Sequence, residues 1–305
     1  STRNHSTEPM VIGASGLVGG AFFKSLRGAG YAVAGTYHTR PAPGLRRHDL
    51  KDGMAGLDPE FGMHFVVLAS ALTQVDYCES HTEEAHERNV EQVRTVVEWC
   101  RKAARPLIYF SSDYVFDGAD GPYPEDATPR PINVYGRTKL LAEELVLGLE
   151  RSLVIRITNV FDIGFDDRNF AYRCVTHLRD GRTLVVPSDQ FATPAYATWL
   201  ADQCVTLYER RAILAPDSPR LLHAGCDDVV SRGEFARRTA ALLGADASLI
   251  DERPTAELAQ AARRPLRGGL RNERWKQLLG VERLPLDDAL HDCLPRMRRL
   301  YAEED

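Results

Sequence analysis

The sequence has few cysteines, and their spacing matches no recognised motif. All six are far apart, with no C-x-x-C pair and no nearby histidine at zinc-ligand spacing. We therefore expect neither a disulfide framework nor a metal site, and interpret the thiols as buried groups in a reducing compartment. The cysteines are Cys78, Cys100, Cys174, Cys204, Cys226 and Cys293.

The sequence also lacks an excess of basic residues and any long apolar run. Lys and Arg total 38 against 43 Asp and Glu, so the net charge is -5 and no chain-wide basic surface exists to hold nucleic acid. No apolar stretch approaches the length of a membrane span, and residues 1–9 lack the basic-then-apolar order of a signal peptide. These absences predict a soluble, cytoplasmic protein with no nucleic-acid or membrane partner.

The first half of the chain alternates short β-rich runs with longer helical patterns. The 305 residues are 44% hydrophobic, enough to bury a sizeable core. Strands are predicted at 10–12, 31–37, 65–69, 106–111 and 152–158, and helices at 22–27, 83–103 and 139–149. This alternation predicts an α/β fold with a doubly wound parallel sheet of the Rossmann type.

The pattern loosens after residue 160, where a smaller α/β substrate-binding lobe is predicted. The expected elements are a strand at 181–187 and helices at 193–211, 231–243, 255–262 and 272–279. We therefore expect two domains. Residues 9–160 plus about 193–225 form the dinucleotide-binding domain, and residues 161–192 plus 226–305 form the substrate-binding lobe. Arginine clusters, such as the one after residue 262, are most often solvated, but Arg264, next to Pro265, is kept as a candidate phosphate contact.

A glycine triplet follows the first predicted strand. Gly13, Gly16 and Gly19 stand three apart at the start of a predicted helix, the context of a dinucleotide-binding turn. Missing side chains let the backbone approach a pyrophosphate, whose charge then lies on N–H groups at the helix N-terminus. Ser15 offers a further donor. The alternative is an ordinary glycine-rich turn, but its place in the first βαβ unit favours the cofactor.

The end of the second predicted strand lacks the acid that an NAD-selective site usually carries. Thr36, His38 and Arg40 instead offer donors, and an arginine fork suits a dianionic 2'-phosphate. NADP(H) is therefore the preferred cofactor, with NAD(H) as the alternative. The competing interpretation is that Arg40 is only a loop cation before Pro41.

Tyr135 and Lys139 are the candidate catalytic pair. Of the 11 tyrosines only Tyr135 has a lysine four residues later, a spacing that places both side chains on one helical face. Ser112 ends a predicted strand at the carboxyl edge of the sheet, where such folds place their ligands. Each motif arises readily by chance when taken alone. An unperturbed tyrosine has a pKa of about 10, so it is protonated at neutral pH, as carbonyl reduction requires.

In this order, the glycines, Ser112 and the Tyr/Lys pair resemble the extended short-chain dehydrogenase/reductases, and most closely the dTDP-4-dehydrorhamnose reductases. The resemblance covers nearly the whole chain, and the run 112–118, Ser-Asp-Tyr-Val-Phe-Asp-Gly, is specific. The other resembling segments are 67–71 with 75–76, 89–90, 109–111, 131–136, 169–170, 189–190, 193–194 and 264–265.

The resemblance implies that Ser112, Tyr135 and Lys139 form a catalytic triad and that Lys139 also holds the nicotinamide ribose. A nucleotide-linked 4-keto-6-deoxy sugar would occupy the lobe. Tyr114 stands where related dehydratases carry a Glu, which disfavours dehydration, and Asn159 stands where rhamnose-forming enzymes often carry Trp. The expected substrate residues are Asp113, Tyr114, Val115, Asn159, Asn169 and Arg264.

The cofactor contacts expected from these motifs extend beyond the glycines. They are Gly13, Ser15, Gly16, Leu17, Val18, Thr36, His38, Arg40, Asp49, Leu50, Ala69, Ser70, Ala71, Tyr135 and Lys139. Two other functions stay open: a non-catalytic NADP-binding module similar to the regulatory beta subunit of methionine adenosyltransferase, and a nucleotide-sugar epimerase. A homodimer is a reasonable expectation at this size.

Overall fold

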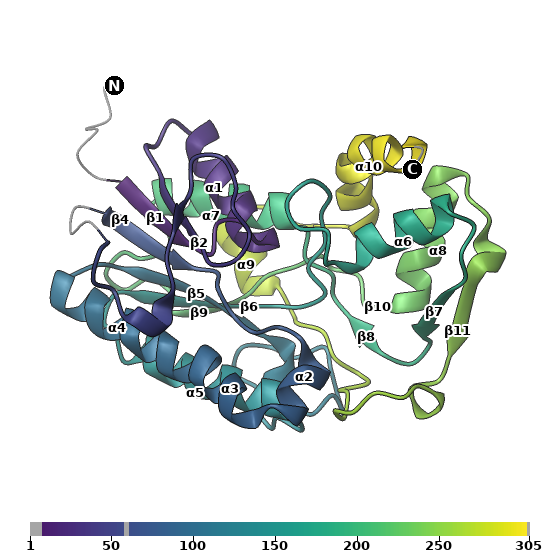
Figure 1. Ribbon diagram of the computed structural model, residues 1–305, viewed down its shortest axis with the longest axis horizontal. Helices are drawn as coiled ribbons and strands as arrows, with labels where there is room; N and C mark the ends of the chain where they lie inside the picture. Colours follow the sequence, from purple (N-terminus) through teal and green to yellow (C-terminus); the bar gives the residue numbers. More distant parts are fainter. Residues whose placement is uncertain (1–7, 58–60, 304–305) are drawn as a thin grey trace.

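A parallel sheet forms the centre of the molecule in the computed structural model, which describes residues 8–57 and 61–303 (Figure 1). Within those residues the sheet has seven strands in the order β3-β2-β1-β4-β5-β6-β9, and every neighbouring pair is parallel. The strands are β1 (Glu8–Ile12), β2 (Ala34–Tyr37), β3 (Arg46–Arg47), β4 (Phe61–Leu68), β5 (Leu107–Ser112), β6 (Ser152–Ile157) and β9 (Leu221–His223). The predicted doubly wound parallel sheet is confirmed.

The strand order reverses between β1 and β4, and this reversal positions the site. The chain moves outward from β1 to β2 and β3, then returns to the other side of β1. Open α/β sheets bind ligands beyond the carboxyl ends of the strands at such a point.

The prediction that residues 1–9 form no signal peptide concerns mainly residues 1–7, which lie outside the described part of the chain.

Helices cover both faces of the sheet. On β1, Val11 points to the core shared with Phe22 of α1 and Leu200 of α7, whereas Met10 and Ile12 point to the opposite core. This alternation follows from the period-two geometry of a strand. The covering helices are α1 (Leu17–Gly28), α7 (Ala197–Glu209) and α9 (Glu273–Leu279) on the first face, and α4 (Gln92–Ala103) and α5 (Val134–Leu147) on the second.

The predicted helix at 83–103 is confirmed as a helical segment, but it is not continuous α-helix. It consists of α3 (Thr82–His86), a π-helical turn (Glu87–Glu91) and α4, and the short α2 (Val75–Ser80) precedes it. Single π-turns inside helices frequently occur at functional sites. Here the turn carries the buried side chain of Asn89.

A smaller lobe lies beside the sheet, on the right in Figure 1, with a core of its own around Phe161, Phe235 and Met297. Two short sheets flank its helices: β7 (Leu184–Pro187) pairs with β11 (Ile250–Arg253), and β8 (Phe191–Ala192) pairs with β10 (Val230–Ser231). The helices are α6 (Phe170–Arg179), α8 (Arg232–Leu243) and α10 (Leu286–Ala302). No helix in the described ranges is long and apolar enough to cross a membrane.

The predicted helix at 255–262 is wrong. Only one 3-10 turn, η5 (Thr255–Glu257), forms there, because the N–H of Ala262, which a helix would pair with the Leu258 carbonyl, instead donates to the Asp76 carboxylate at 2.9 Å. Further along, the backbone pairs outside the lobe, where the carbonyls of Arg267 and Gly269 accept from the N–H groups of Gly121 and Tyr123. The helices α6 and α10 are not among the predicted elements.

Candidate active site

The turn between β1 and α1 is built from close backbone contacts. Gly13 has φ +85°, and a Cβ there would lie 2.9 Å from the Ser70 nitrogen. A Cβ on Gly19 would overlap the carbonyl oxygen of Gly13. The N–H of Ala14 donates to the Thr36 carbonyl at 2.8 Å. The structure therefore brings the glycine turn together with the ends of β2 and β4, the segments in which cofactor contacts were predicted.

The N-terminus of α1 is suited to an anion. Gly16 is its N-cap and no side chain accepts from the first N–H groups, which belong to the turn starting at Leu17 and Val18. Free N–H groups and the positive end of the helix dipole together favour a phosphate. Ser15, half-buried, precedes them. A backbone cradle that any Cβ would fill, next to an uncapped helix, fits a dinucleotide.

The end of β2 carries the residues predicted to select the cofactor. Thr36 is buried and its hydroxyl accepts from the Gly13 N–H at 3.4 Å. His38 lies 3.1 Å from the Asp49 carboxylate, which also accepts from the Lys51 N–H and caps a 3-10 turn containing the buried Leu50. Burial acts to raise the pKa of Asp49, but these hydrogen bonds outweigh it and lower the pKa.

Arg40 lies at the same edge, and its guanidinium contacts the lobe. It donates to Asp166 at 2.8 Å and to Asp167 at 3.4 Å, and its side chain is 41% exposed. The sequence gives no sign of this partner, which is 126 residues away. A 2'-phosphate at this position would compete with or join the Asp166 contact.

The first turn of α5 is fixed from three sides. Asn133 caps the helix by accepting from the Gly136 N–H at 2.8 Å, and the Glu79 carboxylate accepts from the Val134 N–H at 2.9 Å. Gly136 packs directly on the Tyr114 carbonyl, where a Cβ would overlap the oxygen. These contacts position Tyr135 above the end of β5.

Ser112, Tyr135 and Lys139, the predicted triad, lie where β5 ends and α5 begins. Ser112 ends β5 and is buried; its hydroxyl accepts from the Tyr114 N–H at 3.1 Å and donates to the Asp113 carboxylate at 3.4 Å, and it acts to lower the pKa of Tyr135. Lys139 is only 3% exposed, and its ammonium lies 4.4 Å from the centre of the Tyr109 ring. Three polar groups thus meet at the carboxyl edge of the sheet, beside the glycine turn.

Burial controls the protonation of this group. It raises the pKa of Tyr135, the charges of Cys78, Tyr114 and Asp113 raise it further, and the Ser112 hydrogen bond opposes them. Burial also lowers the pKa of Lys139 to about 7, against the charge of Glu143 one turn along α5. Tyr135 therefore holds its proton at neutral pH, as a proton donor must.

The expected substrate residues divide into open and buried groups. Tyr114 meets the Tyr135 ring edge-on at 5.9 Å, and Asn159 follows β6 with φ 42°. Asp113 is buried, accepts from the Gly269 N–H at 2.9 Å, and has a pKa raised by burial. Val115 is fully buried in a core cluster.

Asn169 and Arg264 have protein partners. Asn169 is the N-cap of α6, accepting from the Tyr172 N–H and donating to the carbonyls of Asp162 and Asp166. The Arg264 guanidinium donates to Asp76 at 2.8 Å, and its charge also acts on Tyr114. The Arg264 contact joins the lobe to the sheet half, whereas the contacts of Asn169 lie within the lobe.

Two residues near the site were not predicted as site residues. Asn89 bonds both backbone groups of Leu72 and also donates to the Thr138 hydroxyl, which ties the loop after β4 to α5. Its only sequence signal was its place in a resembling segment. Arg232 opens α8, and its charge acts on Asp113 and Tyr114. Nothing in the local sequence distinguishes it. Among the described residues, no group of three or more His, Cys, Asp or Glu side chains could hold a metal ion.

A glycine cradle at the sheet reversal, with a Ser-Tyr-Lys group beside it, defines an extended short-chain dehydrogenase/reductase fold. The chain belongs to the family described as RmlD substrate binding domain, whose model matches residues 8–299. The predicted family resemblance is confirmed.

Curated relatives of three kinds cover most of the chain. The probable low-salt glycan biosynthesis reductase Agl14 of Haloferax volcanii is 31% identical, covering 92% of this chain and 95% of its own. The dTDP-4-dehydrorhamnose reductase of Streptomyces griseus is 32% identical, covering 88% and 86%. The methionine adenosyltransferase 2 subunit beta of Danio rerio is 27% identical, covering 93% and 89%. The chain is therefore similar both to proteins named as reductases and to a subunit of methionine adenosyltransferase.

Solved structures with the same fold agree with the assignment of the chain to this family. A hypothetical dTDP-4-dehydrorhamnose reductase from Sulfolobus tokodaii superimposes with a TM-score of 0.80 at 27% identity, covering 93% of this chain and 99% of that one. The dTDP-4-dehydrorhamnose reductase of Bacillus anthracis, solved in complex with NADP, gives a TM-score of 0.79 at 22% identity, covering 95% and 99%. The second likeness is one of fold alone.

Proposed function

We propose that the protein is an NADP(H)-dependent reductase of the 4-keto group of a nucleotide-linked 6-deoxy sugar. The observation that carries the proposal is the half-buried Tyr135, whose raised pKa keeps it protonated, beside the buried Ser112 and Lys139 at the sheet edge that also holds the glycine cradle. Two relatives at 31% and 32% identity are described as reductases, one of them of dTDP-4-dehydrorhamnose.

Each residue of the triad has a role that follows from its position. Tyr135 gives its phenolic proton to the carbonyl oxygen as that oxygen gains charge, and Ser112 orients the oxygen by hydrogen bonding. The nicotinamide cofactor, when bound, supplies the hydride for the carbonyl carbon. Lys139 holds the cofactor ribose and stabilises the phenolate that forms on Tyr135 when its proton is transferred.

The cofactor proposal is NADP(H), with NAD(H) as the alternative. The donors Thr36, His38 and Arg40 support it, together with the NADP complex of the Bacillus anthracis relative. We propose that 9–160 and about 193–225 bind the dinucleotide, and that 161–192 and 226–305 bind the nucleotide sugar. A cytoplasmic location and a homodimer complete the proposal.

The test is NADPH oxidation in the presence of an enzymatically generated dTDP-4-keto-6-deoxy sugar, followed by the loss of nicotinamide absorbance. Tyr135→Phe is expected to lower kcat by about 10²–10⁴ while leaving NADPH affinity unchanged, because only the proton donor is removed. Tyr77→Phe, which removes an exposed phenol bound to Glu84, is the matched control and should keep full activity. Equal loss of cofactor binding in Tyr135→Phe would contradict the assigned role.

The similarity to the methionine adenosyltransferase beta subunit supports a second candidate, a regulatory module. Such a module would bind NADPH without oxidising it against any keto sugar, and it would co-purify with a larger enzyme. An epimerase, the third candidate, would retain tightly bound NAD through purification. Turnover with net NADPH consumption separates the reductase from both.

A further inference from the structure

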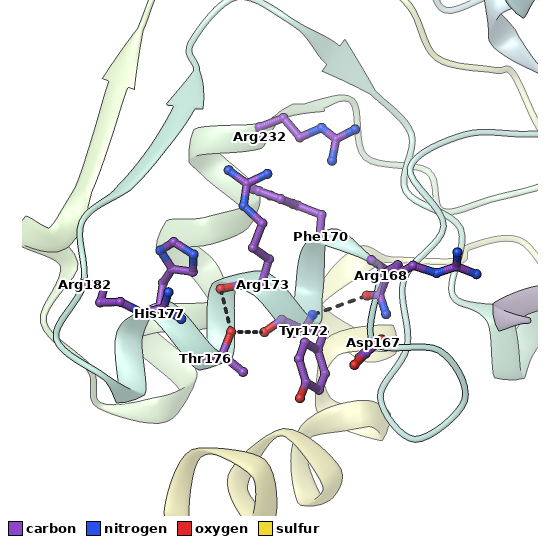
Figure 2. Close-up of a pocket in the computed structure, with 10 residues that line it drawn as sticks. Asp167, Arg168, Phe170, Tyr172, Arg173, Thr176, His177, Arg182 and Arg232 are labelled. Carbon is purple, nitrogen blue, oxygen red and sulfur yellow. Dashed lines mark hydrogen bonds between the residues drawn. The ribbon is translucent and has the colours of Figure 1, made fainter. Parts of the chain in front are cut away.

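A cationic cavity lies in the lobe between α6 and α8 (Figure 2). Its volume is about 490 Å³, within the range of small-ligand sites. Its lining contains five basic side chains and a single carboxylate. The ionisable lining residues are Arg168, Arg173, His177, Arg182, Arg232 and Asp167.

Protein carboxylates neutralise only part of this charge. Arg168 pairs with Asp166 at 2.8 Å, and Arg182 pairs with Asp180 at 3.2 Å. In contrast, no carboxylate of residues 8–57 or 61–303 lies within ion-pair distance of Arg173 or Arg232, although Arg173 donates to a carbonyl, that of Val185, at 3.3 Å.

The two arginines without a carboxylate partner lie around one aromatic ring. The centres of the Arg232 and Arg173 guanidinium groups are 4.8 Å and 6.0 Å from the centre of the Phe170 ring, and Figure 2 shows both side chains beside it. Burial lowers the pKa of Arg232, and the like charge of Arg173 lowers it further. A half-buried guanidinium with no carboxylate beside it is unfavourable, and the like charge of the exposed Arg173 adds to this cost, which an anion in the cavity would relieve.

The cavity adjoins the proposed reaction centre. Ser231, directly before Arg232, pairs with Phe191 of β8, and a Cβ on Gly268 would lie 3.0 Å from the Phe191 carbonyl oxygen and 2.7 Å from the Asp113 carboxylate. The Arg232 charge accordingly acts to lower the pKa of Asp113 and of Tyr114, although burial raises both. These two residues directly follow Ser112. A ligand whose anionic part occupied the cavity could therefore extend from Arg232 to the Tyr135 phenol.

We infer that Arg232 and Arg173 bind the diphosphate group of the nucleotide sugar in this cavity. The inference rests on the proposed function for the identity of the ligand, but the anion site itself stands on the charges and contacts of α6 and α8. An arginine fork matches phosphate oxygens with paired, charge-assisted hydrogen bonds. The stacked Phe170 holds the guanidinium of Arg232 in place for that contact.

The test measures dTDP and UDP binding by calorimetry at fixed salt, with the full-length chain and its variants. Arg232→Gln is expected to weaken binding of whichever nucleotide, dTDP or UDP, the wild-type protein binds more tightly by at least tenfold. Arg173→Gln should weaken it by a smaller factor, and NADPH affinity should be unchanged in both variants. Arg237→Gln is the matched control, because Arg237 lies on the same helix but is 48% exposed and pairs with Glu252. Arg173 is exposed, so its variant tests the site even if Arg232→Gln folds poorly.

The probes separate the sources of the anion. Thymidine, which has no phosphate, is expected to bind wild type and Arg232→Gln equally weakly, and inorganic pyrophosphate to compete with dTDP in wild type only. Unchanged dTDP and UDP affinity in both arginine variants would overturn the inference even if NADPH oxidation proceeds normally. A protein that fails to turn over keto sugars but loses dTDP binding in Arg232→Gln would refute the reductase proposal and leave the anion site intact.

Discussion

The sheet half and the lobe assemble their candidate sites by different means. In the sheet half, backbone approaches backbone: Gly19 against Gly13, and Gly136 against Tyr114, with no room for a Cβ. In the lobe, long charged side chains from separate helices meet over a cavity, as Arg173 and Arg232 do around Phe170. The first kind of site requires a residue type that is visible in the sequence, whereas the second requires neighbours that only the fold supplies.

The comparison is tested most severely at Gly19. Gly19→Ala places a methyl group on the Gly13 carbonyl, so the turn must open, and we expect NADPH affinity to fall at least about a hundredfold with a stability loss of roughly 1–3 kcal/mol. Gly28→Ala on the same helix has no atom within 4 Å of the new Cβ and is expected to keep both. Titration of NADPH fluorescence and thermal unfolding measure the two effects. Unaltered binding in Gly19→Ala would remove the close-contact argument.

Buried and exposed ion pairs sharpen the contrast. Arg156 binds the Glu143 carboxylate through two hydrogen bonds of 2.7 Å and 2.8 Å, with side chains 4% and 2% exposed. Glu143→Gln leaves the Arg156 charge buried without its partner, at an expected cost of about 3–5 kcal/mol. Glu252→Gln in the exposed pair with Arg237 should cost under about 1 kcal/mol. Denaturant unfolding compares them, and equal losses would contradict the role of burial.

Lys139 gives a pH-dependent effect of intermediate size. Below pH 7 the side chain is charged in both the folded and the unfolded states, so the full cost of burying the charge is present. Above its lowered pKa of about 7, the folded protein releases the proton first, and wild-type stability rises with pH. Lys139→Met never carries this charge, so it should be more stable than wild type at pH 7. Because wild type gains stability as the pH rises, this advantage should shrink by about 2–3 kcal/mol between pH 7 and 9. Unfolding curves at pH 6 and pH 9 would show no such difference if the lysine stays charged.

The smallest expected effect is on cofactor selectivity. Arg40→Ala should weaken NADPH about tenfold and leave NADH unchanged, since only NADPH carries the 2'-phosphate. Arg168→Ala is the control: Arg168 binds the same Asp166 carboxylate but is 58% exposed and belongs to the lobe. Dissociation constants for both cofactors measure the ratio. If both variants change it equally, the Asp166 contact rather than a phosphate contact explains the role of Arg40.

Sequence patterns were sufficient for the sheet half because its signals are local. A spacing of four places Tyr135 and Lys139 on one face of α5, and the helix cap is local too, because Asn133 accepts from the N–H of Gly136 three residues later. The structure of the lobe was harder to predict from the sequence. The segment 255–262 has helical composition, but Asp76, distant in sequence, accepts the Ala262 N–H that a helix would pair with the Leu258 carbonyl.

The same reason explains the unpredicted partners. Arg40 pairs with Asp166, and Arg264 pairs with Asp76, 188 residues away in the sequence. The role of each arginine therefore depends on a contact that no local pattern encodes. Arg232 is one of many arginines in the chain, and only the fold distinguishes it, by surrounding it with a cavity and leaving it without a carboxylate.

Asn89 sets the spacing of the whole site. Its one planar amide holds the backbone of Leu72, beyond the loop that packs on Gly13, and at its other contact holds Thr138, between Tyr135 and Lys139. A rigid group a few bonds long thus joins the loop after β4 to the helix that carries the proton donor, in addition to the contacts that position the first turn of α5. A chain that varies its lobe from one substrate to another can therefore keep the reach between hydride and proton constant.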